Sequence, residues 1–175
     1  GVVSYSYDPS VLAHSSGKPI IDSFTLVVTD LAGDKASDTL DIAITDTAPL
    51  ANPDQGTIVE DGSNPVLGSV LANDTASADA GSKVTTVGKF VGQYGELLLK
   101  ADGSYEYQLN NSHPAVNALN IGGQLADAFS YTMRDGDGSI SSNTLTVTIN
   151  GTNDGPVANP DVKVISEDTL AVGNV

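Results

Sequence analysis

An internal repeat of about a hundred residues constrains the fold of this chain more than any other feature of its sequence. The segment DSFTLVVTDLAGDKASDTLDIAIT at residues 22–45 matches DAFSYTMRDGDGSISSNTLTVTIN at residues 127–150, with a constant offset of 105 residues. A second pair, APLANPDQGTIVED at 48–61 and GPVANPDVKVISED at 155–168, is offset by 107 residues. A repeat of this length has the size of one sandwich domain, so a tandem array is predicted.

The matched segments also predict the borders of the units. Residues 49–155 are expected to make one complete repeat. Residues 1–48 correspond to the C-terminal part of a preceding repeat, and residues 156–175 to the opening strands of a following repeat. The first segment is interpreted either as an arbitrary cut or as part of a repeat split by an inserted domain. A partial sandwich leaves strand edges unpaired, so one hypothesis is that the last segment of one molecule adds strands to the first segment of another.

Alternation of apolar and polar residues predicts an all-β chain. In NTLTVTIN, the side chains of Leu145, Val147 and Ile149 are expected on one face and threonines on the other, which indicates a strand with one buried face. Predicted strands are 2–7, 22–29, 37–45, 83–91, 94–100, 103–109, 127–134 and 142–150. Gly- and Asp-rich turns separate them, and one short helical turn is predicted at 113–120. Short strands with such turns favour an antiparallel β-sandwich.

The charge of the chain excludes several partners. The net charge is −15, with 22 acidic and 7 basic residues. Such a chain repels nucleic acid and anionic lipid, and no apolar run approaches the roughly 18 residues of a membrane span, so nucleic-acid binding and membrane insertion are not expected. There is no cysteine, which removes disulfides and thiolate metal sites. Calcium bound by oxygen ligands is the usual alternative means of stabilising a β-fold that has no disulfides.

Signatures of catalysis are weak, and the chain is not expected to be an enzyme. The two histidines, His14 and His113, have neither the spacing of a zinc site nor a neighbouring nucleophile elbow. The DGDGS segment resembles the start of an EF-hand loop, but the twelfth position from Asp135 is Thr146, within a predicted strand. Carboxylates are numerous, and turn residues or calcium ligands are the simpler interpretation than a glycosidase pair.

Several segments in order carry a family resemblance. YGELLLKADGSYEYQLNNSHPAVNAL, followed by LADAFSYTMRDGDGSISSNTLTVTINGTNDGPVANPD, resembles the VCBS repeat. The segments that begin with ANPD, at 51–54 and 158–161, resemble the opening of bacterial cadherin-like domains. The resemblance implies tandem immunoglobulin-like, cadherin-like β-sandwiches in large secreted bacterial proteins, often RTX-type adhesins. It also implies calcium binding, an extracellular location and roles in cell adhesion or biofilm formation.

In cadherin-like folds the linker, an acidic pair and loop carboxylates converge at each junction, and the resemblance places metal ligands accordingly. For the second junction these are Asp135, Asp137, Asn153, Asp154, Asp161 and Glu167. For the first junction they are Asp46, Asn52, Asp54 and Glu60, where a weaker or different site is expected because the Asn-Asp pair is missing. The loop at 72–83 supplies only Asp74 and Asp79, so it is not counted as a calcium loop. Each single Asp also has a simpler interpretation as a turn former.

These observations predict a calcium-stabilised extender of a bacterial surface adhesin, secreted or displayed on the cell, that projects a ligand-binding region. Its partners would be neighbouring repeats of the same chain, with host or cell-surface glycans or peptides bound through adjacent domains. The alternatives are a glycan- or peptide-binding module, the split domain flanking one, or a noncatalytic module of a secreted enzyme. The tyrosine pairs at Tyr5 and Tyr7 and at Tyr105 and Tyr107 either form a binding platform or pack between strands.

Overall fold

The computed structural model describes residues 4–9, 18–79, 81–156 and 158–174, so His14 and the start of the predicted strand 2–7 lie outside the described residues. Among the described residues there are ten strands and no helix: β1 (Ile20–Thr29), β2 (Lys35–Ile44), β3 (Asp54–Val59), β4 (Val66–Ser69), β5 (Lys83–Val84), β6 (Gly88–Val91), β7 (Gly95–Leu99), β8 (Ser104–Leu109), β9 (Gln124–Arg134) and β10 (Ile140–Asn150). The predicted all-β class is confirmed. Within the described part, no helix is long and apolar enough to cross a membrane.

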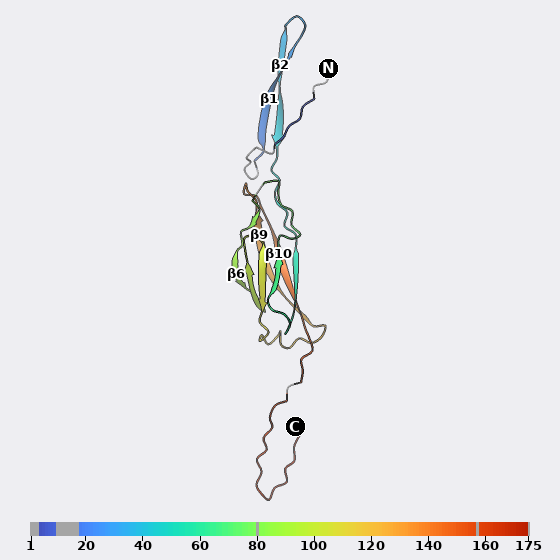
Figure 1. The fold of residues 1–175 in the computed structure, drawn as a ribbon, viewed down its shortest axis with the longest axis vertical. Coiled ribbons are helices and arrows are strands. Elements are labelled where there is room, and N and C mark those ends of the chain that lie inside the picture. Colours follow the sequence, from blue (N-terminus) through green and yellow to red (C-terminus); the bar gives the residue numbers. More distant parts are fainter. Residues whose placement is uncertain (1–3, 10–17, 80, 157, 175) are drawn as a thin grey trace.

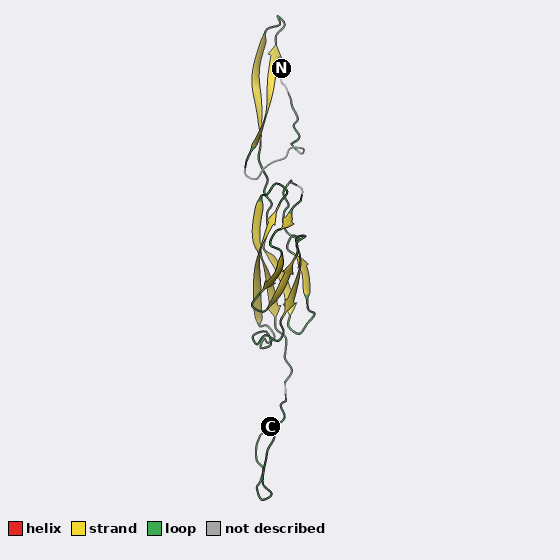
Figure 2. Ribbon diagram, turned by 90° about the vertical axis from the view of Figure 1, so that its left-hand side faces the viewer, coloured by secondary structure: helices red, strands yellow, loops and turns green. Residues whose placement is uncertain are grey.

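The central part of the molecule is a β-sandwich (Figure 1). One sheet has the order β3-β10-β9-β5 and the other β4-β8-β7-β6. The β1-β2 hairpin lies beyond one end of the sandwich and the C-terminal segment beyond the other (Figure 2). The expected inner face of β10 is confirmed, because Leu145, Val147 and Ile149 are buried in the core. They share that core with aromatic and aliphatic side chains of β7 and β8 in the facing sheet.

Two features of the sheets differ from the sequence prediction. First, β3 pairs with β10 in parallel, in a register that runs from Asp54 opposite Leu145 to Val59 opposite Asn150, whereas the other strand pairs are antiparallel. Second, the predicted strand 83–91 is two strands, β5 and β6, that belong to different sheets. Periodicity reveals neither feature, since both strand directions have a period of two residues and a strand that changes sheet keeps its alternation.

The predicted helical turn at 113–120 is a series of hydrogen-bonded turns. The Val116 N–H donates to the His113 carbonyl at 2.9 Å, and the Leu119 N–H donates to the Val116 carbonyl at 3.0 Å. These bonds span three residues, and a segment this short does not repay the cost of nucleating an α-helix. The turn instead places Val116, which is fully buried, in the core of the sandwich.

The β1-β2 hairpin repeats contacts that are found inside the sandwich. Tyr107 packs edge-on against Phe129 with ring centroids 6.0 Å apart, and its hydroxyl donates to Asp127 at 2.7 Å. In the hairpin region, Tyr7 packs edge-on against Phe24 at 6.0 Å and donates to Asp22 at 3.0 Å. Asp22 and Phe24 are the residues that the 105-residue offset matches to Asp127 and Phe129.

Within the described residues, the hairpin makes these contacts without a facing sheet. Its two strands pair over ten residues, yet Phe24 and Leu26 remain 41% and 45% exposed, whereas their sandwich counterparts are buried. The paired tyrosines differ in the same way: Tyr105 and Tyr107 are core residues, so packing between strands is confirmed for them, while Tyr5 is exposed. A two-stranded ribbon with an open apolar face gains little stability by itself.

The described residues of the C-terminal segment after β10 form no strand. Residues 158–174 are exposed, with one turn in which the Thr169 N–H donates to the Ser166 carbonyl at 3.1 Å. The matching strand of the complete repeat, β3, is held by its pairing with β10 of the same unit. Residues 161–166 have no such partner within the described structure, so the expected opening strands are not formed there.

Candidate metal centre

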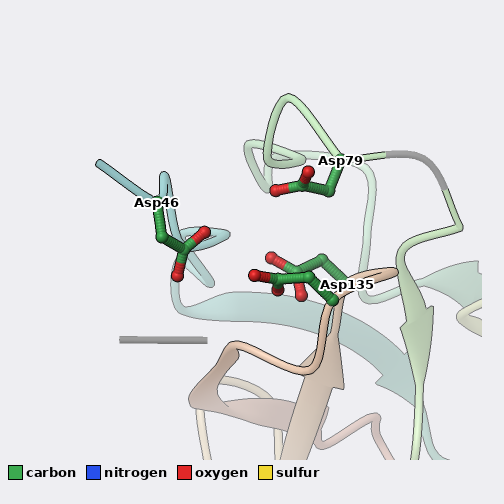
Figure 3. Close-up of side chains that lie close together, drawn as sticks. Asp46, Asp79 and Asp135 are labelled. Atoms are coloured by element: carbon green, nitrogen blue, oxygen red, sulfur yellow. The ribbon is translucent and has the colours of Figure 1, made fainter. Parts of the chain in front are cut away.

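Four carboxylates meet at the end of the sandwich nearest the hairpin. Figure 3 shows three of them, Asp46, Asp79 and Asp135, facing one another. Asp46, Asp79, Asp135 and Asp137 each offer one oxygen, and these oxygens all lie within 4.8 Å of one another. Asp46 follows β2 in the connector to the sandwich, Asp79 lies in the loop before β5, and Asp135 and Asp137 lie in the β9-β10 loop. The centre therefore joins the connector to two loops of the sandwich.

The conformation of the DGDGS loop is held by hydrogen bonds from its backbone to its own carboxylates. The Gly138 N–H donates to Asp135 Oδ1 at 3.0 Å, and the Ser139 N–H donates to Asp137 Oδ1 at 3.1 Å. Gly138 has a φ of +112°, a conformation that favours glycine. Asx turns of this kind use one oxygen of each carboxylate and leave the other free to face the centre.

Among the described residues, three carboxylate oxygens of the centre are buried without a hydrogen-bond partner: Asp46 Oδ1, Asp135 Oδ2 and Asp137 Oδ2. Asp135 is only 4% exposed, and Asp46 uses its other oxygen to accept the Ser139 hydroxyl at 2.6 Å. Buried carboxylate oxygens are costly unless a donor or a cation compensates them. The arrangement could therefore hold a metal ion.

Asp135 and Asp137 interact as two neighbouring acids. Burial raises the pKa of Asp135, but close contacts with Asp137 and Ser77 and the backbone N–H groups of the loop outweigh this effect, so its pKa lies below the ordinary value. The same contact with Asp135 raises the pKa of Asp137. The opposite shifts are those expected of two adjacent carboxylates, because the charge of one disfavours ionisation of the other.

Of the sequence-predicted ligands, the structure brings together Asp46, Asp135 and Asp137. It adds Asp79, which sequence reasoning left out because its loop is poor in Asp. The missing information is a long-range pairing: Lys83 of β5 lies opposite Arg134 of β9, so the loop just before β5 lies beside Asp135. The sequence alone does not show that these two loops occupy the same end of the sandwich.

The structure does not place Glu60 and Asp54 in the same site as Asp46. Strand β3 separates Asp54 from Glu60 by about 20 Å. Because β3 is parallel to β10, Glu60 lies beside the chain that leaves the sandwich: its N–H donates to the Asn150 carbonyl at 3.0 Å, and its Oε1 accepts the Thr152 N–H at 2.6 Å. The set predicted for the first junction is therefore divided between the two ends of the repeat.

The ligands predicted in the second linker are solvent-exposed, and within the described residues no further cluster of three or more acids includes them. They are Asn153, Asp154, Asp161 and Glu167. Asp154 accepts a hydrogen bond through its backbone carbonyl from the side chain of Asn153, at 3.3 Å. The prediction is therefore wrong for Asp135 and Asp137, which were assigned to the second junction: the structure places them with Asp46 of the first junction, and the linker residues of the second junction lie apart from them.

The family model of the bacterial cadherin-like domain matches residues 46–151 of the chain. The match covers more than half of the sequence and contains the eight strands of the sandwich together with all four acids of the centre. A search of curated proteins finds no match.

Proposed function

This chain belongs to the bacterial cadherin-like domain family, and from that premise we propose that it is a calcium-stabilised extender segment of a large bacterial surface adhesin. Bacterial cadherin-like domains occur in extracellular proteins as structural or adhesion-type modules, and their β-sandwich is a non-enzymatic fold. The observation that carries the proposal is the centre of four carboxylates, in which Asp46 of the connector meets loops of the sandwich.

The donor set favours calcium over other metals. All four side chains are carboxylates, and calcium takes six to eight oxygens, which water and backbone carbonyls would complete. Zinc and copper sites rely on imidazole or thiolate, and the chain has no cysteine. Magnesium keeps most of its water shell and uses one or two carboxylates, fewer than this centre presents.

Calcium at this centre would stiffen the junction. Without the ion, the connector is held to the β9-β10 loop by the hydrogen bond between Asp46 and Ser139. An ion shared by Asp46, Asp79 and Asp135 would tie the connector to two loops and cancel their mutual repulsion. The direction in which the chain enters the sandwich would then be fixed, as a rigid extender requires.

The proposed array places this repeat between two others. Residues 1–48 would be the C-terminal part of a preceding repeat, which the matching contacts of Tyr7 and Tyr107 support. Residues 156–175 would open a following repeat. The second linker, with Asn153, Asp154, Asp161 and Glu167, would then supply ligands to the next junction, as Asp46 does to the first.

In this proposal the segment is secreted and displayed at the cell surface, where its partners are neighbouring repeats of an RTX-type adhesin built of VCBS-like units. Its role is to project a ligand-binding region that supports cell adhesion or biofilm formation. The net charge of −15 fits such a role, because bound cations lower the repulsion along an acidic rod.

Calcium titration followed by calorimetry and thermal unfolding tests the proposal. At a calcium concentration 100 times the Kd, binding to one site would stabilise the fold by about 2.7 kcal/mol, and chelation should remove this gain. Asp135→Asn should abolish it, whereas Asp34→Asn, in the exposed β1-β2 turn, serves as a matched control that should not.

The sign of the effect separates a metal centre from a structural acid. Without calcium, Asp135→Asn removes repulsion from Asp137 but also the contacts that favour the ionised form of Asp135. These two effects oppose each other, so the loss of stability without calcium should be much smaller than the loss in calcium. Small-angle scattering of the wild type should show a narrower range of hairpin orientations in calcium. If the addition of calcium changes neither the melting temperature nor the scattering profile, the proposal is refuted.

A further inference from the structure

A second group of oxygens surrounds the hydroxyl of Tyr131, away from the four-carboxylate centre. Tyr131 is only 1% exposed, and its hydroxyl oxygen lies 3.0 Å from the Asn52 carbonyl and 3.1 Å from the Val70 carbonyl. Both carboxylate oxygens of Asp74 lie at 3.1–3.2 Å from the same atom. A phenol has one proton, so it satisfies only one of these four acceptors at a time.

Asp54 adds another carboxylate to this group. It is 7% exposed, and its Oδ2 is buried without a hydrogen-bond partner. Burial raises the pKa of Asp54; the nearby Tyr131 hydroxyl opposes this effect and the charge of Asp74 adds to it, so both neighbours lie within electrostatic reach. An unpartnered carboxylate oxygen in the interior is a costly feature that requires an explanation.

Two reciprocal asparagine contacts hold the group in place. Asn52 donates its side-chain amide to the Asn73 carbonyl at 2.8 Å, and Asn73 donates its own to the Pro53 carbonyl at 2.9 Å. The backbones of Leu50 and Thr75 exchange two hydrogen bonds of 2.9 Å. The segments ANPD and ANDT are therefore clamped together, and the oxygens are positioned before any ligand arrives.

The acceptors outnumber the donors. Besides the Tyr131 hydroxyl, the Asn52 N–H reaches one oxygen of Asp74, at 2.7 Å. Protonation of Asp54 would supply a single further proton. A hard cation compensates several oxygens at once, and a mixture of carboxylate, carbonyl and hydroxyl oxygens is the ligand chemistry that calcium accepts.

We propose that the sandwich has a second binding site for a divalent hard cation, formed by the carboxylates of Asp54 and Asp74 with the carbonyl oxygens of Asn52 and Val70 beside the Tyr131 hydroxyl. The site is distinct from the junction centre, since neither Asp54 nor Asp74 belongs to the group of four acids. It lies within a single repeat, so it would stiffen the sandwich itself and not the connector. The inference does not depend on the proposed function.

Calcium stoichiometry of the full chain tests the proposal directly. Isothermal titration of the wild type should detect one more equivalent of bound calcium per chain than titration of Asp54→Asn or of Asp74→Asn. The junction variant Asp135→Asn is the matched control and should retain the equivalent that depends on Asp54. A double variant, Asp54→Asn with Asp135→Asn, should lose both.

Terbium provides an independent readout, because the ion replaces calcium and its emission is excited through nearby aromatic rings. The chain has six tyrosines and no tryptophan, and Tyr131 contacts the proposed site. Emission excited through tyrosine should fall at least several-fold in Asp54→Asn, whereas Asp135→Asn should keep most of it. Circular dichroism of each variant establishes that the sandwich is folded.

The same variants would also show that the second site does not exist. If Asp54 is a neutral buried acid, asparagine has a similar shape and hydrogen-bonding capacity, so Asp54→Asn would leave stoichiometry and emission unchanged and would not lower the melting temperature in calcium. That outcome would overturn the second site. Loss of binding in Asp135→Asn alone would support only the junction centre, and loss in Asp54→Asn alone would support only the site proposed here.

Discussion

The contact between Tyr107 and Asp127 gives a quantitative test of how the sandwich is held together. Tyr107 is fully buried, and its hydroxyl donates to Asp127 Oδ2 at 2.7 Å. The same carboxylate accepts the backbone N–H groups of Gln93 at 2.7 Å and Tyr94 at 3.0 Å. Asp127 thus ties β8 and the β6-β7 turn of one sheet to β9 of the other.

Tyr107→Phe removes one donor and little volume, so the main cost is the lost hydrogen bond and not a cavity. A hydrogen bond to a charged group contributes about 1.5–3 kcal/mol, and Asp127 retains its two backbone donors. We therefore expect a loss of about 2 kcal/mol in the free energy of unfolding, which lowers the Tm of a domain of this size by roughly 10 °C.

Tyr7→Phe is the matched control, because Tyr7 makes the same contact with Asp22 where, in the part of the chain that the structure describes, no second sheet covers it. Tyr7 and Asp22 are both half-exposed, so this substitution should change the sandwich transition by less than about 0.5 kcal/mol. Urea unfolding followed by far-ultraviolet circular dichroism measures both variants. Equal losses for the two, or a loss below about 0.5 kcal/mol for Tyr107→Phe, would refute the reasoning.

Two further outcomes are expected from the same core. Gly92→Ala should destabilise the sandwich by about 1–3 kcal/mol, because the added Cβ would overlap the Asp127 carboxylate and the Phe129 ring; thermal unfolding would measure it, and an unchanged Tm would contradict the close packing. Burial, followed by hydrogen bonds to carboxylates, raises the pKa of Tyr107 and of Tyr131 above the ordinary value. The folded state therefore favours the neutral phenols. The stability that depends on them is complete below about pH 10 and is lost as the pH rises further. Urea titrations at increasing alkaline pH should show this loss, and a Tyr107→Phe variant with the same slope as the wild type would argue against it.

Local sequence patterns were sufficient for much of the fold. The strands β1, β2, β9 and β10 begin and end within two residues of the predicted segments or extend them, and the buried face of β10 follows from the alternation of Leu145, Val147 and Ile149. The strands β3 and β4 were not predicted, because DQGTIV and VLGS are short and contain glycine. Their assignment required the partners that they meet in the folded chain.

In the candidate centre, too, some residues were predicted from the sequence and others are brought in only by the fold. The acid-rich turn between β9 and β10 and the acid of the connector are visible in the sequence, and both enter the group of four carboxylates. Asp79 enters it only because β5 pairs with the end of β9, and Glu60 is excluded because β3 runs parallel to β10. The Asp74 carboxylate likewise contacts the hydroxyl of Tyr131, which is 57 residues away in the chain.

The sequence by itself determined the repeat, the all-β class, the inward face of the long strands and the supply of oxygen ligands, since each follows from local residue patterns or from the comparison of one segment with another. The tertiary structure alone decided which acids share a site. Alternation with a period of two is identical for parallel and antiparallel pairing and carries no information about which loops meet at one end of a sandwich. Those choices are made by long-range strand pairing, which brings Asp46 to Asp135 and takes Glu60 to the opposite end.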